Sequence, residues 1–241
     1  MTNPRLDQIR IENARYEKQT PYNHCDRWCE RCPHERQARC TLYKDELERK
    51  VTAIAHGRDE DDLQVTEEVM NWQYEGVDEK IQKFMEEEGI DLEEINLDDS
   101  DDPAIEKIKA HTAFVENNPL EKTMEEYHKR VHDFLQKTFF TTENIVHELQ
   151  YDFETVAWYH TLLPAKLHRA LCGFHEQIAE GDISLCDAVA QFDICLDGIE
   201  KSLQALRRLK THYPQDEKLI SELLALLQNL SSRIKSMMEN I

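Results

Sequence analysis

The chain has little of what membrane, secreted and nucleic-acid-binding proteins need. Its 241 residues contain no apolar run near the ~18–20 residues that cross a bilayer, and the first twenty contain no apolar stretch typical of a secretory signal. Basic residues are outnumbered, with 29 Lys and Arg against 49 Asp and Glu, a net charge of −20. This balance argues against surfaces for phosphate backbones or anionic lipids, which need positive charge. We therefore expect a cytoplasmic protein that binds neither nucleic acid nor membrane.

Glycine is also scarce, with six residues in the whole chain, whereas Leu, Glu, Lys and Ala are common. This composition favours helices over hairpin-rich or doubly wound folds. After Pro103, four stretches repeat apolar residues every three or four positions. Their stripes comprise Leu120, Met124, Tyr127, Val131, Phe134 and Thr138; Ile145, Leu149, Val156, Leu163, Leu167, Phe174 and Ile178; Leu185, Val189, Phe192, Leu196, Ile199, Leu203 and Leu206; and Ile220, Leu223, Leu227, Leu230, Ile234, Met237 and Ile241. Because each stripe must be buried against the others, we predict an all-α fold built on an antiparallel four-helix bundle.

Three regions make up the predicted chain. A cysteine-rich segment with a helix occupies residues 1–56 and ends at a His56-Gly57 C-cap signal. An acidic helical linker follows at 57–103, and the bundle occupies 104–241. Residues 58–102 hold 19 acidic and three basic residues, a local net charge of −16. We interpret this stretch as a solubilising linker, and the alternative is a docking surface for a protein partner.

The most informative motif is a C-x3-C-x2-C-x7-C cluster near the N-terminus. It consists of Cys25, Cys29, Cys32 and Cys40, four of the seven cysteines within 16 residues. In a reducing compartment, such a cluster indicates metal binding or redox chemistry rather than a disulfide. Arg27, Arg31, Arg36 and Arg39 surround it and would favour ionised sulfur. We therefore predict that these four thiolates hold one metal centre.

Two centres fit the motif. A [4Fe–4S] cluster is slightly favoured, because Cys32-Pro33 is similar to the Cys-Pro pair of bacterial ferredoxin motifs. Zinc is the alternative, held by four thiolates or by three with His24 or His34. The first three cysteines also have the spacing of the radical-SAM signature. That family usually has an aromatic where Arg31 stands, and it needs a β/α barrel, which a helical chain does not offer.

Two stretches carry a resemblance to other proteins. The sequences NHCDRWCERC and AWYHTLLPAKLHRALCG resemble a group of uncharacterised bacterial proteins with a cysteine-rich N-terminal segment on a helical body. The resemblance implies a C-x3-C-x2-C-x(n)-C segment and no known activity.

The predicted bundle carries one Glu-x-x-His motif, from Glu125 to His128. Glu121 and His132 lie on the same flank of the helix, away from the apolar stripe. A di-iron centre needs a second copy on another helix, and the sequence has none. We therefore interpret this flank as an exposed face.

A second polar set lies on the apolar stripe of the next helix, where His160 follows Asp152 by two turns. Pro164 has no N–H to offer the His160 carbonyl, so the helix should kink there. The pair could line the pocket of a bundle enzyme, although a satisfied core histidine is the simpler interpretation. The remaining cysteines, Cys172, Cys186 and Cys195, are expected to fill the core.

From these patterns we predict a metal-binding helical protein that is not an enzyme. Its metal centre would be mainly structural, and it would act through protein interaction. The alternative is an iron–sulfur redox or electron-transfer protein. An enzyme with a pocket at His160 and Asp152 is the third hypothesis.

Overall fold

The computed structural model describes residues 3–241 except 61, 63, 66, 69–70, 72–74, 89–102, 141–146 and 181. Every regular element in this part of the chain is a helix, as the composition predicts. The chain divides into two compact units, one formed by Met1–Glu30 with Ile108–Ile241 and the other by Arg31–Lys107. None of the described helices is long and apolar enough to cross a membrane.

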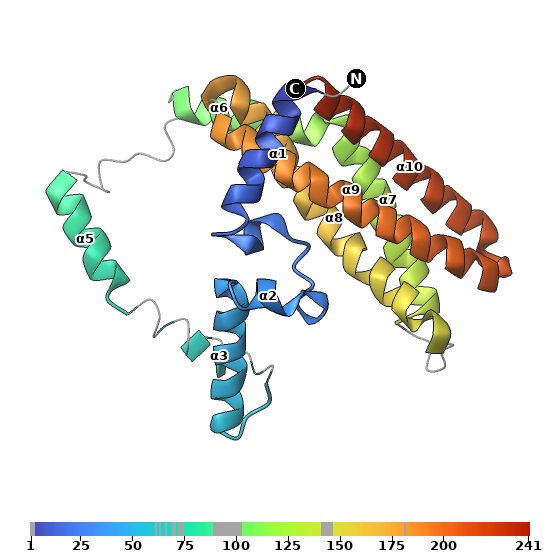
Figure 1. The fold of residues 1–241 in the computed structure, drawn as a ribbon, viewed down its shortest axis with the longest axis horizontal. Coiled ribbons are helices and arrows are strands. Elements are labelled where there is room, and N and C mark those ends of the chain that lie inside the picture. The colour runs from blue at the N-terminus through green and yellow to red at the C-terminus, as the bar shows by residue number, and fades with distance from the viewer. Residues whose placement is uncertain are drawn as a thin grey trace. The chain divides into compact units, whose positions relative to one another are not determined.

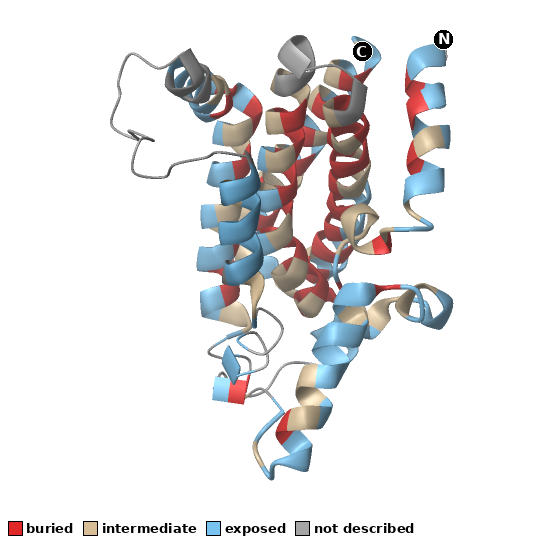
Figure 2. Cartoon of the chain, turned by 90° about the vertical axis from the view of Figure 1, so that its left-hand side faces the viewer, coloured by how far each residue is buried: buried red, intermediate tan, exposed pale blue. Residues whose placement is uncertain are grey.

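Four long helices dominate the larger unit: α7 (Pro119–Thr138), α8 (His147–Glu180), α9 (Asp182–His212) and α10 (Glu217–Glu239). Helix α8 packs against α7 and α9, and α10 packs against the same two helices (Figure 1). The buried residues line the faces where these helices meet (Figure 2). They include Tyr127, Phe153, Leu167, Phe192 and Leu227, each with no exposed surface. Most residues of the four predicted stripes are therefore confirmed as core, whereas five are only half-buried: Thr138, Phe174, Leu196, Met237 and Ile241. Ile145 and the side chain of Ile178 lie outside the described residues.

Helix α1 (Pro4–Tyr16) belongs to the larger unit and packs on α9. The Asn13 amide donates a hydrogen bond of 2.8 Å to the Cys186 carbonyl, and the Arg10 guanidinium forms a two-pronged ion pair with Asp193 at 2.9 and 2.6 Å. Leu6 and Ile9 of α1 join the same hydrophobic core. The N-terminal lead, predicted as part of the cysteine-rich region, thus packs with the long helices.

The smaller unit contains α2 (His34–Gln37), α3 (Thr41–Ala55) and α5 (Val77–Glu88). Helix α3 ends as predicted, because Gly57 after the His56 cap adopts the left-handed conformation with φ +69°. Helix α5 lies within the acidic linker predicted to be helical. The end of the acidic stretch, residues 89–102, lies outside the described residues. Helix α6 (Pro103–Asn117) and a short 3-10 turn (Cys29–Arg31) contain the two points where the units divide.

Candidate metal centre and its surroundings

The cysteine motif spans the division between the two units. Cys25 and Cys29 belong to the larger unit, and Cys32 and Cys40 belong to the smaller one. All seven cysteines lie in the described part of the chain, and none is in a disulfide. In the described residues, no group of three or more His, Cys, Asp or Glu side chains is placed to hold a metal ion. The four-thiolate centre therefore stays a prediction.

The backbone around Cys25 follows a defined path in the larger unit. A 3-10 turn, Pro21–His24, leads into Cys25, whose backbone is extended. Arg27 then adopts a left-handed conformation with φ 55°, which is uncommon for a residue with a side chain. The Asp26 carboxylate accepts a hydrogen bond of 3.2 Å from the Trp28 amide, which closes the turn. A tight turn therefore connects Cys25 to Cys29.

Contacts from Trp28 and Asp26 anchor this turn on α8 and α9. The Trp28 ring stacks on Trp158, with ring centroids 5.2 Å apart. The Trp158 indole donates a hydrogen bond of 2.9 Å to the Asp26 carbonyl, and the Tyr159 hydroxyl donates one to the Asp26 carboxylate. Lys201 of α9 contacts both Tyr159, at 3.0 Å, and Asp26, at 3.4 Å. The segment that carries the first two cysteines is thus attached by aromatic and ionic contacts.

The charge on Asp26 is stabilised by this arrangement. Burial alone would raise the pKa of its carboxyl group, but the hydrogen bonds from Tyr159 and the Trp28 amide and the nearby Lys201 charge outweigh it. The pKa of Asp26 therefore lies below its ordinary value. At neutral pH the carboxylate is ionised and holds the turn.

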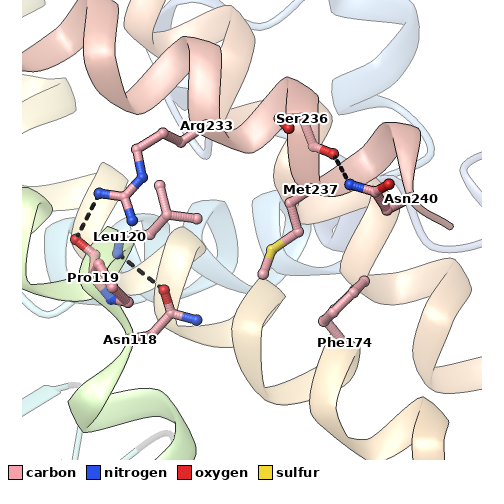
Figure 3. Close-up of a pocket in the computed structure, with 8 residues that line it drawn as sticks. All are labelled: Asn118, Pro119, Leu120, Phe174, Arg233, Ser236, Met237 and Asn240. Carbon is pink, nitrogen blue, oxygen red and sulfur yellow. Dashed lines mark hydrogen bonds between the residues drawn. The ribbon is translucent and has the colours of Figure 1, made fainter.

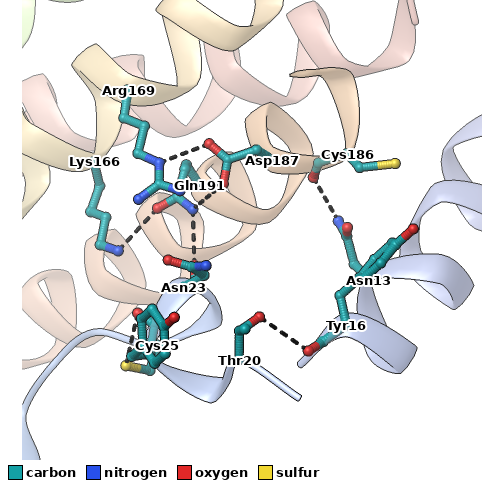
Figure 4. A network of polar contacts seen from close by, with 11 residues as sticks. Asn13, Tyr16, Thr20, Asn23, Cys25, Lys166, Arg169, Cys186, Asp187 and Gln191 are labelled. Carbon is teal, nitrogen blue, oxygen red and sulfur yellow. Dashed lines mark hydrogen bonds and ion pairs between the residues drawn. The ribbon is translucent and has the colours of Figure 1, made fainter. Parts of the chain in front are cut away.

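A buried cation lies near the turn that leads into Cys25. Lys166 of α8 is only 6% exposed, and in the described chain its ammonium has one hydrogen-bond acceptor, the Gln191 side-chain oxygen at 3.0 Å. Gln191 in turn donates 2.9 Å to the Asn23 carbonyl and 3.1 Å to Asp187, so Lys166 is tied to the turn just before Cys25 (Figure 4). An ammonium has three N–H donors, and in the described chain this one has a single acceptor.

Electrostatics around Lys166 favour an anion. Burial lowers the pKa of Lys166, and the positive charges of Arg27 and Arg169 lower it further, whereas the thiols of Cys25 and Cys195 act in the opposite direction. Arg169 has its own partner in Asp187, with two hydrogen bonds of 2.7 Å. A negatively charged group near Cys25 would therefore stabilise the charged form of Lys166. Sequence reasoning missed Lys166, which looks like an ordinary helical lysine in the printed sequence.

The histidine and aspartate of the predicted enzyme pocket have other partners. Asp152 is 2% exposed and forms an ion pair with Arg208 of α9, accepting hydrogen bonds from its guanidinium. The His160 ring donates to the Ala157 carbonyl of its own helix, and burial, with His128 and His132 nearby, lowers its pKa. In the described chain, no hydrogen bond joins Asp152 to His160. The core interpretation of His160 is favoured by this arrangement.

Pro164 lies inside α8, and the kink predicted there stays a prediction. As expected, the proline supplies no N–H to the His160 carbonyl. That carbonyl accepts a hydrogen bond of 2.8 Å from Nδ1 of His128 on α7, in place of the helical N–H that proline lacks. The prediction that His128 and Glu121 lie on an exposed face is therefore wrong. Both are half-buried, and Glu121 contacts His168 at 3.0 Å. The exposed-face interpretation holds for Glu125 and His132.

A separate depression of about 450 Å³ lies between α7, α8 and α10 (Figure 3). Its lining includes Leu120, Phe174 and Met237, and Arg233 donates to the Pro119 carbonyl at its edge. It is open and mainly apolar, and neither His160 nor Asp152 lines it. The depression offers no group for acid–base chemistry.

Searches against family models, curated proteins and solved structures found no match to this chain.

Proposed function

We propose that the chain is a metal-binding protein whose centre is held by Cys25, Cys29, Cys32 and Cys40. The observation that carries the proposal is the buried Lys166 ammonium, which has a single acceptor in the described chain and is tied through Gln191 to the backbone at Asn23, two residues before Cys25. Burying a charge whose one partner is neutral is costly. A centre with four thiolates is a net anion for zinc and for an oxidised iron–sulfur cluster alike, so either would offset this cost.

The anchoring of the turn also supports the proposal. The contacts of Asp26 and Trp28 hold the backbone on either side of Arg27 in place before any ligand binds. Pre-organised ligands lose less conformational entropy when they bind. The backbone between two of the four predicted ligands, Cys25 and Cys29, is therefore held by these contacts.

For the whole chain, we propose a mainly structural centre and a role in protein interaction. The four long helices would form an antiparallel four-helix bundle as scaffold, since each contacts two neighbours. Helix α5 supports an interaction role for the acidic stretch, because it exposes Ile81 (50%) and Phe84 (56%) among acidic side chains. An exposed apolar and acidic helical face fits a partner with a groove rimmed by basic residues. The iron–sulfur redox alternative depends on which metal is bound.

The test is the metal content of the full chain, purified without oxygen. We expect one centre per chain, and broad visible absorbance with bound iron would support the redox alternative, whereas a colourless protein with zinc would support the structural role. Cys25→Ser and Cys40→Ser should each lose the centre. Cys195→Ala is the matched control, because this thiol is fully buried and burial raises its pKa to about 12.

Lys166→Met tests the observation behind the proposal. The substitution keeps an unbranched side chain that is one atom shorter and removes its charge, so the retained metal should fall on dialysis against a chelator. Lys166→Arg should retain more metal than Lys166→Met. A native wild-type chain without metal, in which all four thiols of the motif react at the rate of a model thiol, would refute the proposal.

A further inference from the structure

A pair of histidines outside the cysteine motif has its ring nitrogens in direct contact. His111 of α6 and His175 of α8 place their Nδ1 atoms 3.1 Å apart. Their ring centroids lie 5.0 Å apart at an interplanar angle of 67°, so the two rings present their Nδ1 edges to each other. Both residues belong to the larger unit and are half-buried.

We propose that His111 and His175 form a second metal site, which binds a divalent transition-metal ion such as Zn²⁺ through the two Nδ1 atoms. Imidazole nitrogens suit zinc, copper and nickel. Two nitrogens at ~2.0–2.1 Å from one tetrahedral zinc ion lie about 3.3 Å apart, and the centroids of their rings then lie roughly 5 Å apart. The ring centroids of His111 and His175 already lie at this separation, and their Nδ1 atoms need to move apart by only about 0.2 Å.

The proton balance of binding is simple. In the structure, one Nδ1 carries the proton of the contact and the other accepts it, since two nitrogens can form a hydrogen bond only in this way. When the ion enters, that proton moves to Nε2 of the same ring. Both Nδ1 lone pairs then face the ion, and both rings stay neutral.

The surroundings suit an ion with solvent in its other positions. In the described residues, no third His, Cys, Asp or Glu completes a set with this pair, so water would supply the remaining ligands, as in open zinc sites. Phe114 packs on the His175 ring at 4.5 Å and holds its orientation. The net charge of −20 raises the concentration of cations near the protein.

The site would clamp α6 onto α8. From residue 108 onward, α6 is held on the larger unit by the buried Val115 and the half-buried Phe114 near its C-terminal end. His111 lies one turn earlier, so an ion shared with His175 would fix that turn as well. We therefore expect Zn²⁺ to slow amide hydrogen exchange in residues 110–117.

The test is a Zn²⁺ titration of the chelator-treated full chain, followed by the ¹⁵N resonances of the histidine rings. We expect the Nδ1 resonances of His111 and His175 to shift together, and His111→Gln and His175→Gln each to lose one equivalent of bound Zn²⁺. His212→Ala is the control, because this exposed histidine bonds the Arg208 carbonyl of its own helix. The ¹⁵N shifts of the histidine rings do not depend on the cysteines. The two-histidine site can therefore be refuted while the four-cysteine centre stands, and the reverse.

Two results would overturn the second site. One is a pair of Nδ1 resonances that stay unchanged while Zn²⁺ binds elsewhere. The other is an unchanged number of equivalents in both glutamine variants, or an equal loss in His212→Ala. The ring resonances of the wild-type chain decide the question even if a variant folds poorly.

Discussion

The close approach of α8 and α9 at Gly198 gives a prediction that connects packing to the cysteine segment. A Cβ atom at Gly198 would lie 2.7 Å from Cδ1 and 3.0 Å from Cε1 of Tyr159, and 3.1 Å from Cδ2 of Leu163. Tyr159 is only 1% exposed, so its ring has no open space into which to move. We therefore expect Gly198→Ala to displace Tyr159.

Two effects of opposite sign set the magnitude. Alanine is favoured over glycine inside a helix by ~1 kcal/mol. Overpacking a close-packed core costs ~1–3 kcal/mol, and a displaced Tyr159 also loses hydrogen bonds to Asp26 and Lys201, each worth ~1 kcal/mol. The losses exceed the gain, and we expect the free energy of unfolding to fall by about 2–4 kcal/mol.

Urea unfolding of Gly198→Ala measures this change. Near-ultraviolet circular dichroism gives a second readout, because the stacked Trp28 and Trp158 rings depend on the same turn. We expect this signal to weaken and Cys25 to react faster with thiol reagents. Gly198 is distant in sequence from both Trp28 and Cys25.

A double-mutant cycle separates the clash from other effects. With Tyr159→Leu in place, the ring atoms are gone, and Gly198→Ala should become neutral or stabilising because only the helix preference and the Leu163 contact remain. A single Gly198→Ala variant as stable as the wild type would refute the reasoning. So would an equal loss of stability in the Tyr159→Leu background.

Three further predictions test the anchors of the helices. The pKa of Asp26 lies below its ordinary value, so its contribution to stability is present above the ordinary carboxyl pKa and is lost as pH falls through the lowered value. The near-ultraviolet signal should show this acid transition, and the Asp26→Asn variant should lack it. Arg208→Met leaves the Asp152 carboxylate buried without its partner and should lower the free energy of unfolding by about 1–3 kcal/mol, and an unchanged thermal midpoint would contradict this. Pro164→Ala restores an N–H for the His160 carbonyl, so the ¹⁵N resonances of the histidine bonded to that carbonyl should shift; unchanged resonances would show that the proline is not the cause.

Much of the fold could be predicted from the sequence, because it depends on local patterns. Apolar residues at intervals of three and four define the buried face of a helix whatever its neighbours are. The stripes that contain Tyr127, Leu163, Phe192 and Leu227 are accordingly buried. The end of α3 at Gly57 follows for the same reason, since a left-handed residue after a helix is a local preference for glycine.

The pairing of polar side chains between helices could not be predicted in this way. Asp152 lies two turns before His160 on the same stripe, yet its partner is Arg208 of another helix. Glu121 and His128 share the flank of α7 with Glu125, yet only the first two turn toward α8. Which residues meet depends on the relative rotation of the helices, and the printed sequence carries no direct signal for it.

Lys166 shows what this limit means for the candidate metal centre. The cysteine spacing indicates the ligands, but it does not identify the groups that would balance their negative charge. The printed sequence offers the arginines of the motif for that role, whereas the structure adds a lysine far along the chain, buried and tied through Gln191 to the backbone at Asn23. Of these arginines, Arg27 and Arg39 are exposed, and an exposed charge is solvated whether or not a metal binds, so it gives little preference for the bound form. A buried ammonium has less solvation to lose, and this difference is why the proposal of an anionic centre rests on Lys166 and not on the arginines.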